Sequence, residues 1–383
     1  MNIVTKIKQL IEELCPNGIG YKELQDILTI KNGSDYKNLG EGDFPVYGSG
    51  GIMTYVDRFA YDKPSVLIPR KGSIDKLYYV DTPFWNVDTI FYTEINTDVA
   101  IPKFVFYCLQ KQHLEELNTA GGVPSLTQKV LNKVKIPVPP LPVQSEIVRI
   151  LDNFTELTAE LTAELTARRQ QYEYYNNTLL SFDNAKYKTL EELCDIVDYR
   201  GKTPRKVDDG IFLVTAKNIR KGFIDYDKSK EYISPEDYDE VMHRGFPKIG
   251  DVLITTEAPC GNVAQIDNEN IALAQRVIKY RPKNNNLNST FLKYVLLGKE
   301  FQDKLERAAT GGTVKGIKGS KLHQLTIPVP SIEEQERIVA ILDRFDTLCN
   351  DISAGLPAEI EARQRQYEYY RDKLLTFKEL IAN

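Results

Sequence analysis

The sequence predicts an α+β fold in which two mixed globular domains are separated by two long helical regions that pair as an antiparallel coiled coil. Three observations predict this fold: an internal duplication, a long amphipathic stretch after each Pro-rich segment, and short β-rich runs ahead of each such segment. Each copy contains one globular region followed by one helical region. The chain is therefore expected to form two halves related by a pseudo-twofold repeat.

The duplication is an ordered series of matches at a nearly constant offset. The tetrapeptide Ile-Pro-Val-Pro at residues 136–139 recurs at residues 327–330, 191 residues later. The pentapeptide Gln-Tyr-Glu-Tyr-Tyr at residues 171–175 recurs at residues 366–370, 195 residues later. Chance supplies one matching tetrapeptide but not such a series, so the pattern indicates a true repeat. The second copy is four residues longer between the two motifs.

The helical regions are predicted from the spacing of apolar residues. Spacings of three and four residues place these residues on one stripe of a helix from about Val143 to Leu180 and of another from about Ile332 to Leu380. Gly and Pro predict a break between Asn350 and Pro357. The first helix contains the tandem Thr-Ala-Glu-Leu repeat Thr158–Leu165, and four helical residues add about 6 Å, which is close to two base-pair steps of about 3.4 Å. A helix of fixed length between two DNA-reading domains would act as a ruler, and a simple dimerisation helix is the alternative.

The first globular region runs from about Tyr21 to Pro137. It contains β-rich runs at residues 65–69 and 89–92 that are separated by Gly-rich turns. Basic and aromatic residues alternate on these loops, which suits contacts with phosphates and bases. The candidate DNA-binding residues of this region are Tyr47, Ser49, Arg70, Lys71, Ser73 and Lys76.

The second globular region runs from about Tyr187 to Pro328. Between Arg200 and Lys221, seven basic residues face only two acidic ones, and this density favours DNA binding over a solvated surface, which is the alternative for any single charge. Arg is able to read guanine, and Asn or Gln adenine. The candidate DNA-binding residues here are Tyr199, Arg200, Lys202, Thr203, Arg205, Lys206, Lys217, Asn218, Arg220, Lys221, Thr256, Arg276, Thr313, Lys315 and Lys318.

The motifs of covalent chemistry are missing from the sequence. An adenine methyltransferase needs a cofactor-binding glycine loop and an Asn-Pro-Pro or Asp-Pro-Pro motif, and neither occurs. The segment from Gly311 to Gly316 has the spacing of a phosphate loop but lacks the Lys-Ser/Thr that follows it. Five dispersed cysteines and three dispersed histidines predict neither a disulfide framework nor a metal site. We therefore expect no catalytic residue, no metal and no cofactor in this chain.

Charge and hydropathy define the expected environment. The net charge of −5 counts mildly against nucleic-acid binding, but a basic face is compatible with acidic helices elsewhere. The sequence contains no apolar run of membrane-spanning length, and its start lacks the pattern of a signal peptide. A cytoplasmic location is expected.

Across its full length, the chain resembles the specificity subunit of type I restriction-modification systems, which act in phage defence. The resemblance rests on the duplicated helical regions, the Thr-Ala-Glu-Leu repeat, and the segments Tyr199–Pro204, Gly250–Ile254 and Pro45–Gly51. It implies two target recognition domains that each read one half of an interrupted site in double-stranded DNA. Base-contacting residues differ between family members, so the candidates above come from local charge alone.

The resemblance also implies partners. Two modification subunits would dock on the helices and methylate adenine at N6 with S-adenosylmethionine, and motor-nuclease subunits would use ATP and Mg²⁺. Membrane association is not expected. The candidate partner-binding residues lie on the helical stripes: Ile147, Leu151, Phe154, Ile338, Leu342 and Phe345.

The expected organisation has five segments. They are an N-terminal helical segment (1–20), target recognition domain 1 (21–137), a central helical spacer (138–186), target recognition domain 2 (187–328) and a C-terminal helical spacer (329–383). Two other functions fit less well. A helical protein-interaction scaffold would not need the basic loops, and a self-contained restriction enzyme would need the missing catalytic motifs.

Overall fold

A computed structural model describes residues 3–118, 121–182, 185–199, 204–312, 315–350 and 354–380. The chain forms two compact units, the first from Met1–Thr162 and Glu359–Asn383 and the second from Ala163–Ala358. The boundary falls within helix α4 (Leu141–Leu179) and in the first turn of α11 (Leu356–Leu374). Each unit therefore combines a globular region with parts of the helical regions.

The first unit is built on an antiparallel sheet with strand order β2-β8-β5-β6 and a three-stranded sheet with order β4-β3-β7. The strands are β2 (Leu28–Lys31), β3 (Phe44–Gly48), β4 (Gly51–Val56), β5 (Ser65–Pro69), β6 (Tyr78–Val80), β7 (Trp85–Asn86) and β8 (Ile90–Ile95), and β1 (Tyr21–Glu23) pairs with β9 (Lys135–Pro137). The helices ahead of α4 are α1 (Ile3–Leu14), α2 (Pro102–Lys111), α3 (Gln128–Leu131) and the 3-10 turns Leu24–Asp26 and Leu114–Leu117.

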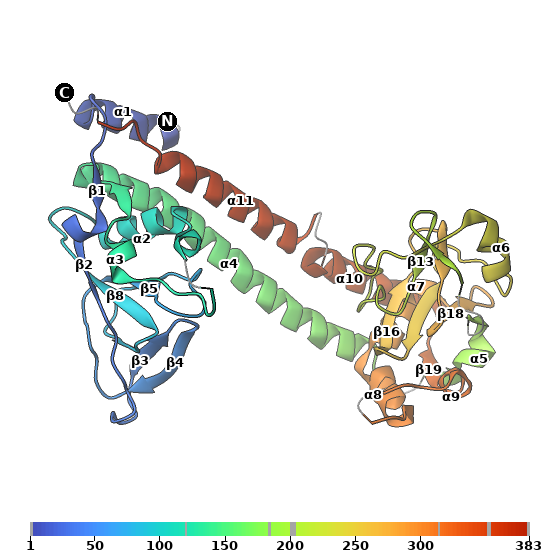
Figure 1. Ribbon diagram of the computed structural model, residues 1–383. Coiled ribbons are helices and arrows are strands. Elements are labelled where there is room, and N and C mark those ends of the chain that lie inside the picture. Colours follow the sequence, from blue (N-terminus) through green and yellow to red (C-terminus); the bar gives the residue numbers. More distant parts are fainter. Residues whose placement is uncertain are drawn as a thin grey trace. The chain divides into compact units, whose positions relative to one another are not determined.

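Strand β5 is buried on both faces, as its unbroken apolar sequence predicts. Val66 and Ile68 join the main core with Phe104 of α2, which covers the sheet in Figure 1. Leu67 points the other way and packs with Phe84. A strand held from both sides fixes the position of the loop that follows it.

The second unit repeats this plan with more elements. One sheet has the order β11-β18-β15-β16, and another has the order β12-β14-β13-β17, in which β13 and β17 are parallel. The strands are β11 (Cys194–Asp198), β12 (Lys206–Val207), β13 (Ile211–Val214), β14 (Tyr232–Ile233), β15 (Val252–Thr256), β16 (Cys260–Gln265), β17 (Ile271–Leu273) and β18 (Val277–Pro282), and β10 (Lys186–Thr189) pairs with β19 (Thr326–Val329). The helices are α5 (Leu190–Leu193), α6 (Tyr238–Val241), α7 (Ser289–Leu297), α8 (Lys299–Ala308), α9 (Gly319–His323), α10 (Ile332–Asn350) and the 3-10 turn Pro235–Asp237.

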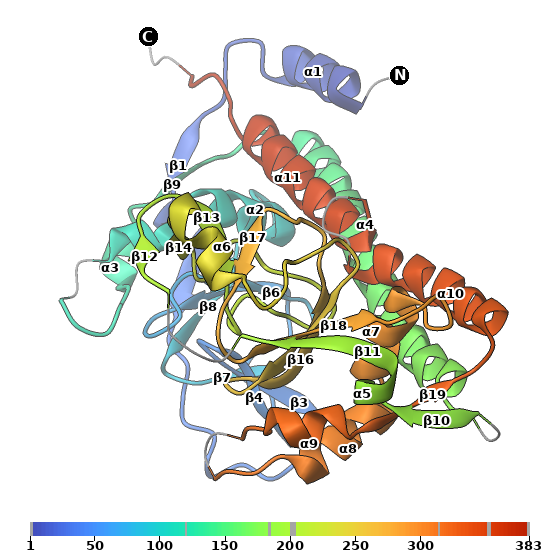
Figure 2. The same cartoon turned by 90° about the vertical axis from the view of Figure 1, so that its right-hand side faces the viewer.

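The helices pair in an antiparallel manner within each unit. In the first unit, the ring of Phe154 on α4 stacks on Tyr370 of α11 at 5.3 Å, and Figures 1 and 2 show these helices side by side. In the second unit, Phe345 of α10 lies 5.4 Å from Tyr175 of α4. Phe345 and Tyr175 are the repeat counterparts of Phe154 and Tyr370. The predicted break is present, because α10 ends at Asn350 and α11 begins at Leu356.

A buried glutamine joins helix and globular region in both units. The Gln144 amide oxygen accepts from the Ile101 N–H at 2.8 Å, and its nitrogen donates to the Val99 and Pro139 carbonyls. Its counterpart Gln335 makes the same three contacts, with the Asn288 N–H and with the Asn286 and Pro330 carbonyls. The duplicated Gln is therefore a packing device that ties each helix to the loop before α2 or α7.

The expected partner-binding residues require a correction. Ile147, Leu151, Ile338 and Leu342 are fully buried in the cores of their own units. The rings of Phe154 and Phe345 pack against the tyrosine rings described above. The apolar stripes therefore serve intramolecular packing in each unit.

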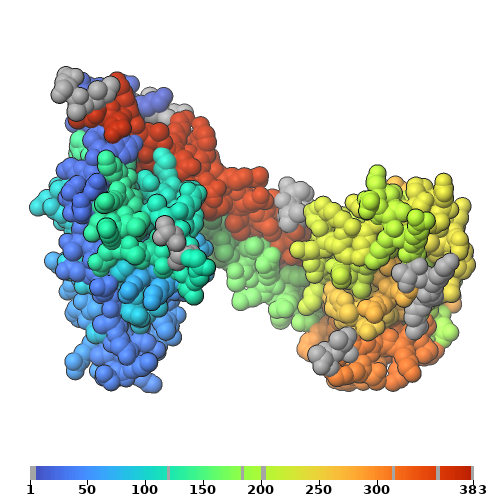
Figure 3. All heavy atoms as spheres, in the orientation of Figure 1, coloured from blue at the N-terminus to red at the C-terminus, as the bar shows by residue number. Residues whose placement is uncertain are grey.

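The two ends of the chain meet within the first unit. A backbone bridge joins Ile19 to Glu379, and the Ile19 N–H donates to the Lys378 carbonyl at 2.9 Å. Figure 3 shows the red C-terminal residues against the blue N-terminal ones. Helix α1 adds Ile7 to the core and pairs Lys6 with Glu146 of α4. Among the described residues, no helix combines the length and apolarity needed to cross a bilayer.

Replacing Gln144 by leucine is expected to lower the free energy of unfolding of the first unit by about 2 to 4 kcal/mol, because the substitution leaves the Ile101 N–H without its partner and removes two further hydrogen bonds. Thermal unfolding followed by circular dichroism measures this change. The matched control is Ser145→Ala, at the exposed neighbouring position on α4. An equal melting temperature for the two variants would contradict the proposed packing role.

Candidate nucleic-acid interface

Three chain segments meet where β15 ends in the second unit. The Thr256 N–H donates to the Arg276 carbonyl, and the Ile317 N–H donates to the Thr256 carbonyl, both at 2.9 Å. Glu257 pairs with Gly316 through a backbone bridge. We call the group of Thr256, Glu257, Arg276, Gly316 and Ile317 the second junction. It combines the end of one strand, the start of another and the segment after the Gly-Gly pair.

The first unit contains the same arrangement. The Arg70 N–H donates to the Thr89 carbonyl at 2.8 Å, and the Leu126 N–H donates to the Arg70 carbonyl at 2.9 Å. Lys71 forms a backbone bridge with Ser125. We call the group of Arg70, Lys71, Thr89, Ser125 and Leu126 the first junction. It corresponds residue by residue to the second junction.

The strand registers support this correspondence. Ile68 pairs with Phe91 across β5 and β8, and Ile254 pairs with Ile278 across β15 and β18. Counting from these pairs matches Arg70 with Thr256, Lys71 with Glu257, and Thr89 with Arg276. The backbone turns through positive φ shortly after each strand, at Gly72 (85°) and at Ala258 (49°). The two units therefore present different side chains on equivalent backbones.

The structure brings the first-unit candidates together around the first junction. The Ser49 N–H donates to the Thr89 hydroxyl at 3.4 Å, and the Tyr78 hydroxyl donates to the Ser49 carbonyl at 3.2 Å. The Tyr47 ring lies 6.0 Å from that of Tyr78. Arg70 extends over the Phe91 ring, with 5.8 Å to the ring centroid. The remaining candidates, Lys71, Ser73 and Lys76, follow on the same loop, and both lysines are exposed.

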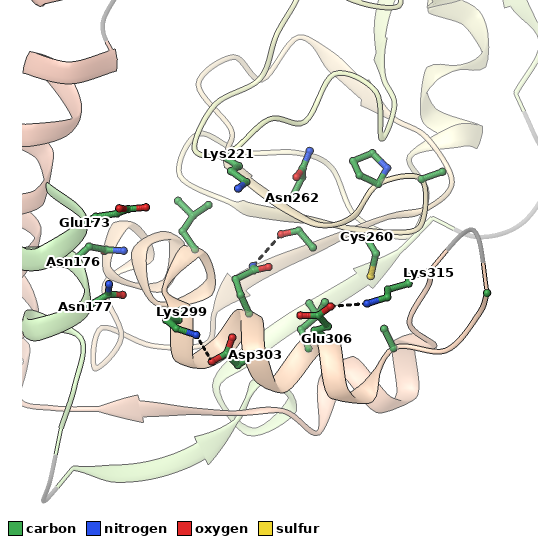
Figure 4. A pocket seen from close by; sticks show the side chains of 18 residues that line it. Glu173, Asn176, Asn177, Lys221, Cys260, Asn262, Lys299, Asp303, Glu306 and Lys315 are labelled. Carbon is green, nitrogen blue, oxygen red and sulfur yellow. Dashed lines mark hydrogen bonds and ion pairs between the residues drawn. The ribbon is translucent and has the colours of Figure 1, made fainter. Parts of the chain in front are cut away.

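The second junction carries an exposed ion pair beside a cavity. Arg276 Nε lies 3.4 Å from Glu257 Oε2, and both side chains are about half exposed. The cavity, about 1010 Å³ in volume, is lined by Lys221, Asn262 and Lys315 together with residues of α8, as Figure 4 shows. Lys315 pairs with Glu306 at 2.5 Å, so part of the basic lining is neutralised.

Several candidates of the second unit are not available for direct contact. Tyr199 is 7% exposed, and its hydroxyl donates to the Gly245 carbonyl, while burial raises the pKa of this phenol above its ordinary value. Asn218 is fully buried, and its amide bonds the Thr215 N–H and the Asp225 carbonyl. The Thr256 hydroxyl is likewise buried at the junction. The expectation of DNA contact is corrected for these three, which shape loops through internal hydrogen bonds.

The other candidates of the second unit are spread over its surface. Arg205, Lys217 and Lys318 are exposed, Lys206 pairs with Glu231 at 2.7 Å, and Arg220 pairs with Asp225 at 3.3 Å. Four candidates lie outside the described residues: Arg200, Lys202, Thr203 and Thr313.

Sequence reasoning missed a buried charge cluster that supports the second unit. Asp251 accepts two hydrogen bonds from the Arg281 guanidinium, at 2.6 and 2.7 Å, and lies 3.3 Å from the ammonium of Lys279. Arg281 also donates to the Phe246 carbonyl, and the side-chain hydrogen bond with Asp251 raises its pKa. The cluster thereby fixes the loop whose Gly245 carbonyl accepts a hydrogen bond from the Tyr199 hydroxyl. Thr89 was also missed, because only the strand register places it at the first junction.

The described residues contain no cluster of three or more His, Cys, Asp or Glu side chains placed to hold a metal ion.

Comparison with known proteins identifies the class. Residues 16–168 and 183–362 match the family described as the type I restriction modification DNA specificity domain. The two matched segments cover most of the chain, which therefore belongs to this family. The resemblance predicted from the duplicated motifs is thus confirmed.

The similar proteins agree with this assignment. The specificity subunit of a type I restriction enzyme of Escherichia coli is 37% identical over 314 residues, which are 74% of this chain and 73% of that protein. A type I restriction enzyme specificity subunit of Haemophilus influenzae is 32% identical over 356 residues, 88% of this chain and 89% of that one. Among solved structures, the S subunit of the type I restriction-modification system of M. genitalium has a TM-score of 0.61 at 16% identity, covering 94% of this chain and 96% of that chain, and so shares the fold.

Proposed function

We propose that this chain is the non-catalytic DNA-recognition subunit of a cytoplasmic type I restriction-modification complex, in which each unit reads one half of a bipartite target. The observation that carries the proposal is the pair of junctions, which share a backbone and differ in their side chains. A duplicated framework with unlike reading groups suits a target whose two halves differ in sequence.

Exposed lysines in both units support DNA binding. Lys71, Lys76, Lys217, Lys221 and Lys318 are exposed, and none has an ion-pair partner among the residues that the structure describes. Free ammonium groups contact phosphates without regard to sequence, whereas groups at fixed strand ends read base edges. This division of roles accommodates the net charge of −5, because the phosphate contacts are local.

Catalysis is assigned to partner chains. Two modification subunits would bind S-adenosylmethionine and methylate adenine at N6, and motor-nuclease subunits would use ATP and Mg²⁺ for restriction. The helices offer them exposed basic residues outside the apolar stripes: Arg149 pairs with Glu146 on α4 at 2.8 Å, and Arg337 pairs with Glu334 on α10 at 2.7 Å. These exposed faces, rather than the buried stripes, are the proposed docking surfaces.

The proposal predicts that deletion of this gene removes one bipartite N6-methyladenine motif from the host genome. Genome-wide mapping of methylated adenines, with and without the gene, measures this. Complementation with the intact gene is expected to restore the motif, and the purified chain alone is expected to show neither methylation nor cleavage. A methylation pattern that is unchanged by deletion would refute the function.

A further inference from the structure

We propose that the paired side chains of Arg276 and Glu257 read a G·C base pair in the half-site of the second unit. The inference rests on the proposed function and assigns a specificity role within it. It follows from the geometry of the ion pair, the rigidity of its backbone and the contrast with the first unit.

The ion pair leaves the reading groups of both side chains free. The contact joins Arg276 Nε to Glu257 Oε2, and the two terminal nitrogens of the guanidinium form no hydrogen bond with the described residues, so they are available as a fork of donors. Guanine presents O6 and N7 as two adjacent acceptors in the major groove, which match such a fork. The second Glu257 oxygen is able to accept from the N4 amino group of cytosine. At 55% and 46% exposure, both side chains are accessible to a duplex.

The backbone holds the pair at a fixed position. Arg276 adopts φ of 70°, its carbonyl accepts the Thr256 N–H, and buried Val277 begins β18 directly after it. Glu257 is tied to Gly316 by its backbone bridge. Because the two residues belong to different segments of one junction, their side chains are placed before any ligand arrives. Such preorganisation reduces the entropy lost on binding.

The first unit presents different chemistry at the same two positions. Thr89 stands at the position of Arg276, and Lys71 stands at that of Glu257. The guanidinium of the first junction comes instead from Arg70, one strand away. An Arg–carboxylate pair is therefore specific to the second junction, as expected if the two half-sites differ.

The test replaces Arg276 by alanine in the full chain, produced with its modification partners in a host that lacks the wild-type gene. Genome-wide mapping of N6-methyladenine is expected to show that one G·C position in one half-site has become degenerate, with discrimination lowered about 5- to 150-fold. The other half-site and the spacer are expected to stay unchanged. Arg276→Lys keeps the charge but loses the fork, so the same position is expected to relax. Glu257→Gln is expected to relax it to a smaller extent.

Lys230→Ala is the matched control, since Lys230 is an exposed cation of the same unit that pairs with Asp227 at 3.2 Å. The inference is overturned by an unchanged motif in Arg276→Lys or by relaxation at an A·T position. It is also overturned by a uniform loss of methylation with unaltered base preference, because that result indicates a phosphate contact. Failure of the proposed function is a separate result, because the wild-type chain would then direct no bipartite motif.

Discussion

Replacing Asp251 by alanine is expected to destabilise the second unit by about 3 to 5 kcal/mol and to abolish directed methylation. Asp251 and Lys279 are both 2% exposed, and the substitution leaves the ammonium buried without its carboxylate. Burial already lowers the pKa of Lys279, and Asp251 is the main group that opposes this shift. The Arg281 guanidinium, which holds the Phe246 carbonyl, also loses its anchor.

Thermal unfolding of the purified chain measures this effect, and methylome mapping reports its functional consequence. Asp208→Ala is the matched control, because Asp208 is an exposed carboxylate of the same unit. Surface substitutions of this kind usually change stability by less than about 0.5 kcal/mol. A shift for Asp251→Ala within that range would show that the cluster does not support the unit.

Inserting a third Thr-Ala-Glu-Leu repeat after Leu165 is expected to move methylation to a site whose unread spacer is one base pair longer. Four helical residues add about 6 Å of rise and turn about 40° beyond a full circle. One base pair supplies about 3.4 Å and about 35°. The rise alone favours two base-pair steps, as the helix length predicts, but the rotation matches one step, with about 3 Å of rise left over. A spacer longer by two base pairs would instead leave an angular mismatch of about 30°, which corresponds to a displacement of about 5 Å at a radius of about 10 Å from the DNA axis.

Genome-wide methylation mapping again provides the measurement, and sites of the original spacing are expected to lose methylation more than about 100-fold, because one half-site falls out of register. Thr162→Ala changes the repeat without changing its length and is expected to keep the original spacer. If the insertion variant still methylates the original sites, helix length does not set the spacer.

Much of the fold was predictable because it depends on local and periodic signals. The apolar run at residues 65–69 predicts β5, which the structure contains as Ser65–Pro69. The break after Asn350 follows from Gly355 and Pro357, which oppose helix continuation. The long central helix was expected from Val143 and begins instead at Leu141, because Pro142 is tolerated in a first turn, where its missing N–H has no helical partner.

The candidate site was only partly predictable from the sequence. Arg70, Lys71 and Arg276 were among the candidates identified from local charge, and they lie at the two junctions. Tyr199 and Asn218 were grouped with exposed cations because they neighbour them in sequence, yet both side chains point into the unit. A short loop alternates between inward and outward side chains, and its composition does not reveal which residues face the core.

The sequence by itself determined the duplication, the helical regions and the absence of catalytic motifs, since all of these follow from residue order and spacing. It also carried the resemblance to a family of recognition subunits. Only the tertiary structure decided which residues share a junction, because hydrogen bonds between β5 and β8, and between β15 and β18, join positions far apart in the chain. It also decided that the apolar stripes of α4 and α10 are internal, because burial against α2 and α7 removes apolar surface from water.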